Sequence, residues 1–332
     1  MLKPVLALTM GDPAGVGPEI VVKTIASWDI EAIPLVVGDG GVLERAQKVS
    51  GITVHWQEAR FPVQGDGPLL LHLGNVDPSF SFGKITPEMG RASYEYIERA
   101  TMLALEKKVQ GIVTAPINKE ALYQAGIPFI GHTEILQSLS GVDQALTMFQ
   151  VGTLRVFFLT RHLSLKEAIE NVKKEALVSF GEKMVLYLRL LGISVPRIAV
   201  AALNPHAGEG GLLGREEIEE IMPAVKELRK RGYQVSGPYP ADSVFFFASQ
   251  GNFDAVLSLY HDQGHIATKC LDFYRTVSVT LGLPFIRTAP DHGTAFDIAG
   301  RGIARYESMY EASRVAAHYA LFYTLPLQNK AS

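Results

Sequence analysis

Short apolar runs alternate with amphipathic stretches along most of the chain. The runs VLALTM, AIPLVVGD, GIVTA, LRVFFLT, PRIAVAAL, DAVLSLY and TVSVTL have the length and near-continuous hydrophobicity of buried strands. Stretches such as RASYEYIERATMLALEKKVQ and REEIEEIMPAVKELRKRG repeat apolar residues at helical spacing. Strands that alternate with helices in this way predict a largely parallel sheet flanked by helices.

Several predicted helices carry signals at their ends. Pro18 lies in the first turn of the helix after VLALTM, and Asn118 is a predicted N-cap. The sequence SLKE, Ser164 to Glu167, has the form of a capping box that opens a helix. Gly232 is predicted to end the helix REEIEEIMPAVKELRKRG. The segment GDGPLLLHLGNVDPSFSFGKITPEMG has no clear period and is predicted to be a surface excursion.

Composition narrows the class of protein. The chain has 332 residues, a length that suits two α/β domains or one large one, and 47% hydrophobic with 20% charged residues is typical of a globular protein. A net charge of −3 without a Lys/Arg block argues against nucleic-acid binding. The single cysteine, Cys270, excludes an internal disulfide and suits a reducing compartment. No apolar stretch approaches the ~18 residues of a membrane span, and no signal peptide is apparent, so we expect a cytoplasmic protein.

Three histidines follow three of the predicted core strands. His162 follows LRVFFLT, His206 follows IAVAAL, and His261 follows DAVLSLY. Because the carboxyl ends of parallel strands lie at one edge of a sheet, the three imidazoles are in a position to converge. Three neutral imidazoles with an open position are typical of a catalytic divalent metal site, most often zinc. Any one of these histidines alone would more often be a hydrogen-bonded loop residue.

Two acids lie close to these histidines in the sequence. Asp262 and Asp242 are candidates for the acceptors that orient ligating imidazoles or contact the substrate. The alternative is that Asp242 is a helix N-cap and Asp262 a turn residue.

A second group of residues suits an anion. His132 and Thr133, in GIPFIGHTEIL, open a predicted helix, whose free N–H groups can bind a phosphate or carboxylate. Lys269 and Arg287 would complete such a pocket, arginine through bidentate pairing. The alternatives are that Thr133 is an N-cap and that both cations are solvated.

Two glycine-rich segments stand next to predicted helices. GDPAGVGP, Gly11 to Pro18, is neither a G-x-G-x-x-G motif nor a Walker loop, and a tight turn explains it equally well. PDHGTAFDIAGRGIA, Pro290 to Ala304, reads as a tight loop before a helix. This second segment also resembles the adenosine-binding segment of isopropylmalate and isocitrate dehydrogenases.

That resemblance implies a site for NAD. The residues matching the loop motif are His292, Gly293, Thr294, Ala295 and Asp297. In those enzymes the residue that matches Asp297 accepts a hydrogen bond from the adenosine ribose 2′-hydroxyl. A carboxylate there favours NAD because it would repel the 2′-phosphate of NADP.

The resemblance extends over nearly the whole chain. MGDPAGVGPEI, GHTE, TRHLSL, LNPHAGEGG, YHDQGH, TLGLPFIRT and DHGTAFDIAG occur in this order between Met10 and Gly300. Together they resemble the 4-hydroxythreonine-4-phosphate dehydrogenase family. The implied fold is the two-domain α/β/α architecture of isopropylmalate dehydrogenase relatives. We expect residues 1–130 with 281–332 to form a first domain that carries the cofactor loop. Residues 131–280 would form a second domain with metal, substrate and dimer contacts.

The resemblance also implies roles for the candidate residues. It places a divalent metal on His162, His206 and His261, at a site completed by both subunits of a homodimer. The implied metal is zinc, with magnesium, manganese and cobalt as alternatives. Contacts to the phosphorylated substrate would come from His132, Thr133, Lys269, Ser278 and Arg287. The family commonly has Asn where this chain has Ser278, in VSVTLGLP, and this departure leaves the substrate open. Candidate catalytic residues are Lys269, His132 and Asp262; Lys269 is either a general base or a phosphate contact.

The expected reaction is the NAD-dependent oxidation of 4-hydroxythreonine 4-phosphate. Its product is a β-keto acid, which loses CO2 to give 3-amino-2-oxopropyl phosphate, a precursor of pyridoxal phosphate. The family alternatives are 4-phospho-D-threonate or 4-phospho-D-erythronate, which would give dihydroxyacetone phosphate, and an aromatic dihydrodiol. A metal-dependent hydrolase or aldolase would use the same histidines without the cofactor loop, and a phosphometabolite-binding module would need no metal. Titration with NADH and metal analysis separate these classes.

Overall fold

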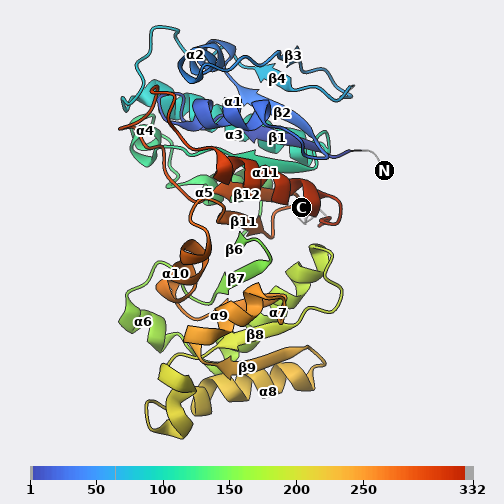
Figure 1. The fold of residues 1–332 in the computed structure, drawn as a ribbon, viewed down its shortest axis with the longest axis vertical. Helices are drawn as coiled ribbons and strands as arrows, with labels where there is room; N and C mark the ends of the chain where they lie inside the picture. Colours follow the sequence, from blue (N-terminus) through green and yellow to red (C-terminus); the bar gives the residue numbers. More distant parts are fainter. Residues whose placement is uncertain (1–2, 64, 326–332) are drawn as a thin grey trace. The chain divides into compact units, whose positions relative to one another are not determined.

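The computed structural model describes residues 3–63 and 65–325, which form two compact units (Figure 1). The first unit combines Met1–Leu146 with Val277–Ser332, and the second is Thr147–Thr276. The predicted domain boundaries lie instead at residues 130 and 280. The difference arises because the helix that begins at His132 packs against a long helix of the first unit. His132, Thr133 and Ser278 therefore lie in the first unit.

The first unit is built on a sheet whose strands are parallel except for one antiparallel pair. The strand order is β3-β4-β2-β1-β5-β12-β11, and only β11 and β12 are antiparallel to each other. These strands are β1 (Val5–Thr9), β2 (Ile33–Gly38), β3 (Gln57–Glu58), β4 (Leu69–His72), β5 (Gly111–Thr114), β11 (Val277–Leu281) and β12 (Ile286–Pro290). The helices are α1 (Gly17–Ala26), α2 (Gly40–Ser50), α3 (Pro87–Leu105), α4 (Lys119–Gln124), α5 (His132–Ser140) and α11 (Glu307–Ala320).

Two groups of helices pack around this sheet. Helix α1 contacts both α2 and α11, and α11 lies along β12 and β5. Helix α3 contacts α4, α5 and the strands β1 and β5. The strands β1 and β5 are fully buried, as their continuous apolar sequences require.

The second unit has a shorter sheet of the same kind. Its strand order is β6-β7-β10-β8-β9, with β6 antiparallel to β7 and the other pairs parallel. The strands are β6 (Leu146–Val151), β7 (Leu154–Phe158), β8 (Ile198–Ala201), β9 (Val235–Tyr239) and β10 (Ala255–Ser258). The helices are α6 (Leu165–Glu170), α7 (Lys174–Leu190), α8 (Met222–Lys230), α9 (Ala241–Ser249) and α10 (His261–Leu271), with the 3-10 segment η1 (Pro205–Gly211) and the π-helix η2 (Glu217–Ile221).

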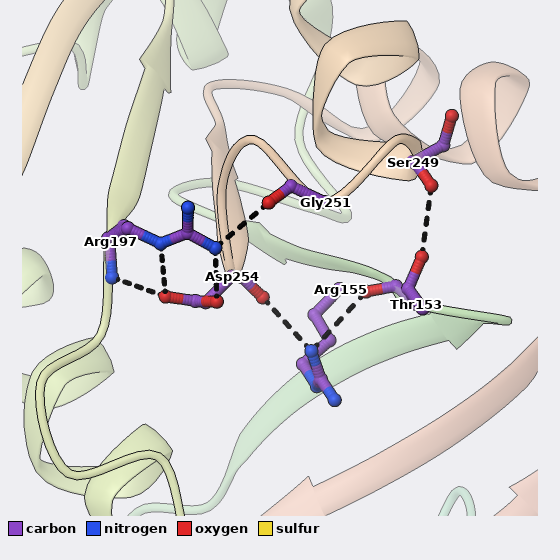
Figure 2. Close-up of polar contacts among 6 residues, drawn as sticks. All are labelled: Thr153, Arg155, Arg197, Ser249, Gly251 and Asp254. Atoms are coloured by element: carbon purple, nitrogen blue, oxygen red, sulfur yellow. Dashed lines mark hydrogen bonds and ion pairs between the residues drawn. The ribbon is translucent and has the colours of Figure 1, made fainter.

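An ion pair fixes the amino-terminal ends of two of these strands (Figure 2). Arg197 precedes β8, and its guanidinium binds both carboxylate oxygens of Asp254, at 3.1 and 3.0 Å. The Arg197 amide also donates to Asp254, at 2.7 Å, and Arg155 donates to the Asp254 carbonyl. These contacts lie at the sheet edge opposite to the one from which the histidines emerge.

The mixed, largely parallel α/β architecture predicted from the sequence is confirmed. The N-cap Asn118, the capping box of Ser164 with Glu167 and the early proline of α1 are also present. The predicted surface excursion is wrong in part, because it contains β4. Among the described residues, no helix has both the length and the apolar character needed to cross a membrane.

Candidate active site

The three strands that precede His162, His206 and His261 are neighbours in the sheet. Strand β10 pairs in parallel with β7 on one side and with β8 on the other. The three histidine-bearing loops therefore leave the same edge of the second unit, as the sequence predicted.

Buried polar groups hold these loops in place. The Gln263 side chain accepts a hydrogen bond from the Leu259 amide at 2.8 Å and donates to the Ala202 carbonyl at 2.7 Å. It thereby ties the turn between β10 and α10 to the end of β8. Thr160 donates to the Leu259 carbonyl at 2.8 Å, which ties the end of β7 to the same turn. Residues that the sequence gave no reason to select thus position His261 and His162.

His261 and His162 lie close together, with ring centroids 6.0 Å apart. A further ring, His265, stacks on His261 at 4.0 Å and packs against Phe149 and Phe158. Burial lowers the pKa of His265 to about 4, with help from the positive charges of His261, Lys269 and Arg161. His265 is therefore a neutral ring at physiological pH. Its position four residues after His261 on α10 is the sequence signal for this contact.

His206 sits on a loop of unusual backbone. Its φ is 51°, and the left-handed conformation continues through Glu209 and Gly210. Strain of this kind concentrates at functional sites. The buried Glu217 anchors the loop by accepting from the Leu203 and Asn204 amides at 2.8 and 2.7 Å. Within the described part of the chain, no three His, Cys, Asp or Glu side chains meet in a metal-binding arrangement.

The donor chemistry of these histidines nevertheless fits a divalent metal. His261 Nδ1 lies 2.7 Å from an Asp262 oxygen, and His206 Nδ1 lies 2.9 Å from a Glu209 oxygen. A carboxylate on Nδ1 fixes the tautomer and presents Nε2 for coordination, as is usual for ligating histidines. The alternative interpretations of the two acids are wrong: Asp262 lies inside α10, and Asp242 follows the N-cap Pro240 of α9.

Lys269 extends the histidine face along α10. It lies two turns after His261, and its ammonium is 5.4 Å from the ring centroid of Phe273. It also lies four residues after His265 on α10, so both side chains lie on one face of that helix. In the second unit, therefore, His162, His261, Asp262, His265 and Lys269 form one cluster.

Arg287 lies in the first unit and is 5% exposed. Its guanidinium donates to Thr114 at 3.1 and 2.6 Å and to Thr280 at 3.0 Å. Among the described residues it has no carboxylate partner. Burial lowers the pKa of Arg287 to about 10, and the guanidinium remains charged at pH 7. A buried cation whose only partners are neutral hydroxyls is arranged to receive an anion.

His132 is a second polar group near this cation. Burial and the charge of Arg287 lower the pKa of His132 well below its usual range, against the opposing effect of a hydrogen bond to the Ala115 backbone. Its Nε2 is buried without a hydrogen-bond partner among the described residues. His132 is therefore a neutral imidazole with an unused nitrogen, which suits a substrate hydroxyl.

Thr133 and Ser278 complete the predicted substrate residues. The N-cap of α5 is Gly131, so the alternative that Thr133 is the N-cap is wrong and its hydroxyl lies in the first turn. Ser278 lies two residues before Thr280 on β11, which places both hydroxyls on one face of the strand.

The predicted cofactor loop, residues 291–304, follows β12. His292, Gly293 and Asp297 are exposed, and the Asp297 carboxylate has no partner among the described residues. Thr294 is buried, and Ala295 adopts a left-handed φ of 40°. An L-residue held in this conformation is a strained feature typical of ligand-binding loops.

The sequence profile of the family described as pyridoxal phosphate biosynthetic protein PdxA matches residues 31–316 of this chain. A protein of Symbiobacterium thermophilum, provisionally named D-threonate 4-phosphate dehydrogenase, is 50% identical over 325 residues, which cover 96% of this chain and 97% of that protein.

Solved structures with the same fold include two proteins titled as 4-hydroxythreonine-4-phosphate dehydrogenases. The one from Burkholderia phymatum has a TM-score of 0.83 and 44% identity, and covers 96% of this chain and 98% of that chain. The one from Klebsiella pneumoniae has a TM-score of 0.86 and 40% identity, with the same coverage of 96% and 98%.

Proposed function

Because the chain belongs to the family described as pyridoxal phosphate biosynthetic protein PdxA, we propose that it is an NAD-dependent, divalent-metal-dependent dehydrogenase of a 4-phosphorylated hydroxy acid. The coarser assignment, an oxidoreductase, is supported by the names of its relatives as dehydrogenases. As substrate we propose D-threonate 4-phosphate, the compound named for the relative with 50% identity. The substrate expected from the sequence, 4-hydroxythreonine 4-phosphate, is the compound named for the solved structures and is the second candidate.

The observation that supports this proposal best is the buried, charged side chain of Arg287. Its buried guanidinium has hydroxyl partners and no carboxylate among the described residues. A phosphate would supply the missing negative charge and accept bidentate hydrogen bonds. The unused Nε2 of His132 would accept a hydrogen bond from a substrate hydroxyl.

In the proposed reaction the substrate would be oxidised at C3, where it would give up a hydride from the C3–H bond and a proton from the C3 hydroxyl. The resulting β-keto acid would then lose CO2 as its C1–C2 bond breaks, and a proton would add to C2 to give dihydroxyacetone phosphate. When bound, NAD accepts the hydride, and a divalent metal acts as a Lewis acid in both steps. His162, His206 and His261 would hold the metal, and His132, Asp262 or Lys269 would take the hydroxyl proton.

The exposed Asp297 carboxylate would accept a hydrogen bond from the adenosine ribose, in a loop formed with His292, Gly293, Thr294 and Ala295. We also propose that two copies of the chain complete each metal site, as the resemblance to the 4-hydroxythreonine-4-phosphate dehydrogenase family implies. Mixing the inactive variants His206→Ala and His261→Ala tests this proposal. Mixed dimers that regain both metal and turnover would support a site that takes His206 from one copy and His261 from the other, and mixtures that stay inactive would contradict that division of the ligands.

The substrate proposal is tested by measuring initial rates of NADH formation. The panel comprises D-threonate 4-phosphate, D-erythronate 4-phosphate, 4-hydroxythreonine 4-phosphate and unphosphorylated D-threonate. Arg287→Ala should lower kcat/KM for the phosphorylated substrate by about 10- to 100-fold, since a charge-assisted hydrogen bond contributes about 1.5–3 kcal/mol. The same variant should change the rate with D-threonate far less.

Arg60→Ala serves as the control, because the Arg60 side chain is 84% exposed. Equal losses on the phosphorylated and unphosphorylated substrates would show that Arg287 is structural. A wild-type enzyme that forms NADH with none of the four compounds would contradict the proposed substrate class.

A further inference from the structure

The motif GDPAGVGPE ends at Glu19, which forms a largely buried ion pair with Lys23 that none of the steps above uses. Glu19, in the first turn of α1, is 2% exposed. Lys23 lies one turn later and forms an ion pair with Glu19 at 2.8 Å. The side chain of Lys23 is only 13% exposed. Removing two such charges from water is costly, so their remaining partners matter.

Those partners are backbone groups of the predicted cofactor loop. Glu19 accepts hydrogen bonds from the amides of Ala304, at 2.6 Å, and Gly302, at 3.2 Å. Lys23 donates to the carbonyls of the same residues, at 2.7 Å for Ala304 and 3.0 Å for Gly302. With its bond to Glu19, all three ammonium donors of Lys23 are used. The ion pair therefore binds the amide and the carbonyl of both Gly302 and Ala304.

At Gly302 the backbone of the loop lies in close contact with the backbone of Val49. The φ of Gly302 is 71°, and a Cβ at this position would lie 2.1 Å from the Val49 carbonyl oxygen. Glycine is required there by both conformation and space. The loop backbone can therefore reach Glu19 and Lys23 only with the residue that the sequence provides.

The same motif also contacts the start of the loop. The Val16 amide donates to the Thr294 carbonyl at 3.0 Å. A Cβ at Gly15 would lie 3.0 Å from the Thr294 Cβ, so the two backbones are in close contact. Asp297 lies between these two anchor points in the sequence. The segment that carries its exposed carboxylate is therefore held at both ends. The turn before α1 binds it at Thr294, and α1 binds it at Gly302 and Ala304.

We propose that Glu19 and Lys23 are a positioning pair for the cofactor, acting through the backbone of residues 302–304. The inference rests on the proposed function, since it assigns the loop to a nicotinamide dinucleotide. A loop fixed before binding does not have to be ordered when the dinucleotide arrives, which strengthens binding without any new contact. Glu19, the last residue of the GDPAGVGPE motif, thus affects cofactor binding through the loop backbone and without touching the cofactor.

The test compares Glu19→Gln with wild type and with the control Glu44→Gln. Glu44 also pairs with a lysine four residues later, Lys48, at 3.0 Å, but both side chains are exposed, at 66% and 72%. Glutamine has nearly the shape of glutamate but offers one acceptor oxygen and no charge. The first measurement is the rate of tryptic cleavage after the exposed Arg301, without cofactor. The second is the dissociation constant of NADH from fluorescence titration, and the third is KM for NAD with kcat.

For Glu19→Gln we expect cleavage after Arg301 to accelerate and the NADH dissociation constant and KM for NAD to rise about ten-fold. We expect kcat at saturating NAD, KM for D-threonate 4-phosphate and metal content to stay within about two-fold of wild type. Glu44→Gln should match wild type throughout. A general structural defect would instead lower kcat and metal content together.

Wild-type cleavage and wild-type NADH affinity in Glu19→Gln would overturn the inference. So would faster cleavage with unchanged NADH affinity, because the loop would then be anchored without serving the cofactor. If Glu19→Gln does not fold, Lys23→Gln is measured in the same way and must give the same pattern. Failure of the proposed function looks different, because wild-type protein itself would then fail to bind NADH.

Discussion

Replacement of Asp12 by asparagine should change how the stability of the protein depends on pH. Asp12 is fully buried in the turn after β1, where its Oδ1 accepts a hydrogen bond from the Ala14 amide at 2.8 Å. Its other oxygen, Oδ2, is buried without a partner among the described residues. Burial raises the pKa of Asp12 from 3.8 to about 6, although the bond from Ala14 opposes the rise.

The size of the effect follows from this shift. One pKa unit corresponds to about 1.4 kcal/mol, so a rise from 3.8 to about 6 corresponds to roughly 3 kcal/mol. Between these two values the folded chain binds a proton that the unfolded chain has released. The free energy of unfolding must therefore fall as pH rises through about 6 and then level off. The contribution is complete only below the unfolded value.

The assay is equilibrium unfolding in urea at pH 5 and pH 8, for wild type and Asp12→Asn. The amide of asparagine cannot ionise, so the variant should lose the part of this contribution that wild type retains at pH 5 and lacks at pH 8, which is about 1.4 kcal/mol for one pKa unit below 6. The buried NH2 group that asparagine adds lacks an acceptor and costs about 1–3 kcal/mol, but it does so at both pH values and cancels. The control is Asp66→Asn, since the Asp66 side chain is 73% exposed. The reasoning is refuted if Asp12→Asn keeps the wild-type pH dependence.

Two further predictions concern other carboxylates. Burial alone would raise the pKa of Asp254, but hydrogen bonds from Arg197 and the charges of Arg197 and Arg155 outweigh it and lower the pKa. Its stabilising effect should therefore be present at pH 7 and be lost as pH falls below about 4. Asp254→Asn should cost about 1–3 kcal/mol in urea unfolding at pH 7 and less at pH 3, and a constant cost would contradict the ion pair. Asp297→Asn should weaken NAD binding by about 1–3 kcal/mol and reduce discrimination against NADP in paired KM measurements. A wild-type enzyme that prefers NADP would contradict that role.

The strands that the sequence predicted are those with continuous apolar runs. Strand β6, LTMFQV, mixes polar with apolar residues, and β9 contains both Gly237 and Pro238, so neither showed a clear pattern. Strand β12 follows the turn LGLP and carries Arg287, a residue that is seldom buried. Their places in the sheets depend on pairing with strands distant in the sequence, which local periodicity does not record.

Some features of the candidate site could also be predicted from the sequence, and others could not. Strand ends identified the three histidines, because a parallel sheet aligns the ends of its strands. Arg287 was recognised as a cation, but its partners Thr114 and Thr280 come from two other strands, and nothing in the sequence links them. The contact of Glu19 with Ala304 spans most of the chain and could not be predicted from either motif alone.

Two buried cations of the first unit, Lys23 and Arg287, differ in the charge of their hydrogen-bond partners. Lys23 has a carboxylate partner, Glu19, and every one of its donors is bound. Arg287 is more deeply buried, yet its partners among the described residues are neutral threonine hydroxyls. A fold that needed Arg287 only for stability would be expected to pair it as it pairs Lys23, because an uncompensated buried charge is costly. Exceptions to local consistency are expected where a ligand completes the structure. The missing negative charge at Arg287 is therefore the observation that supports the proposed phosphate site, because a phosphate would neutralise the guanidinium.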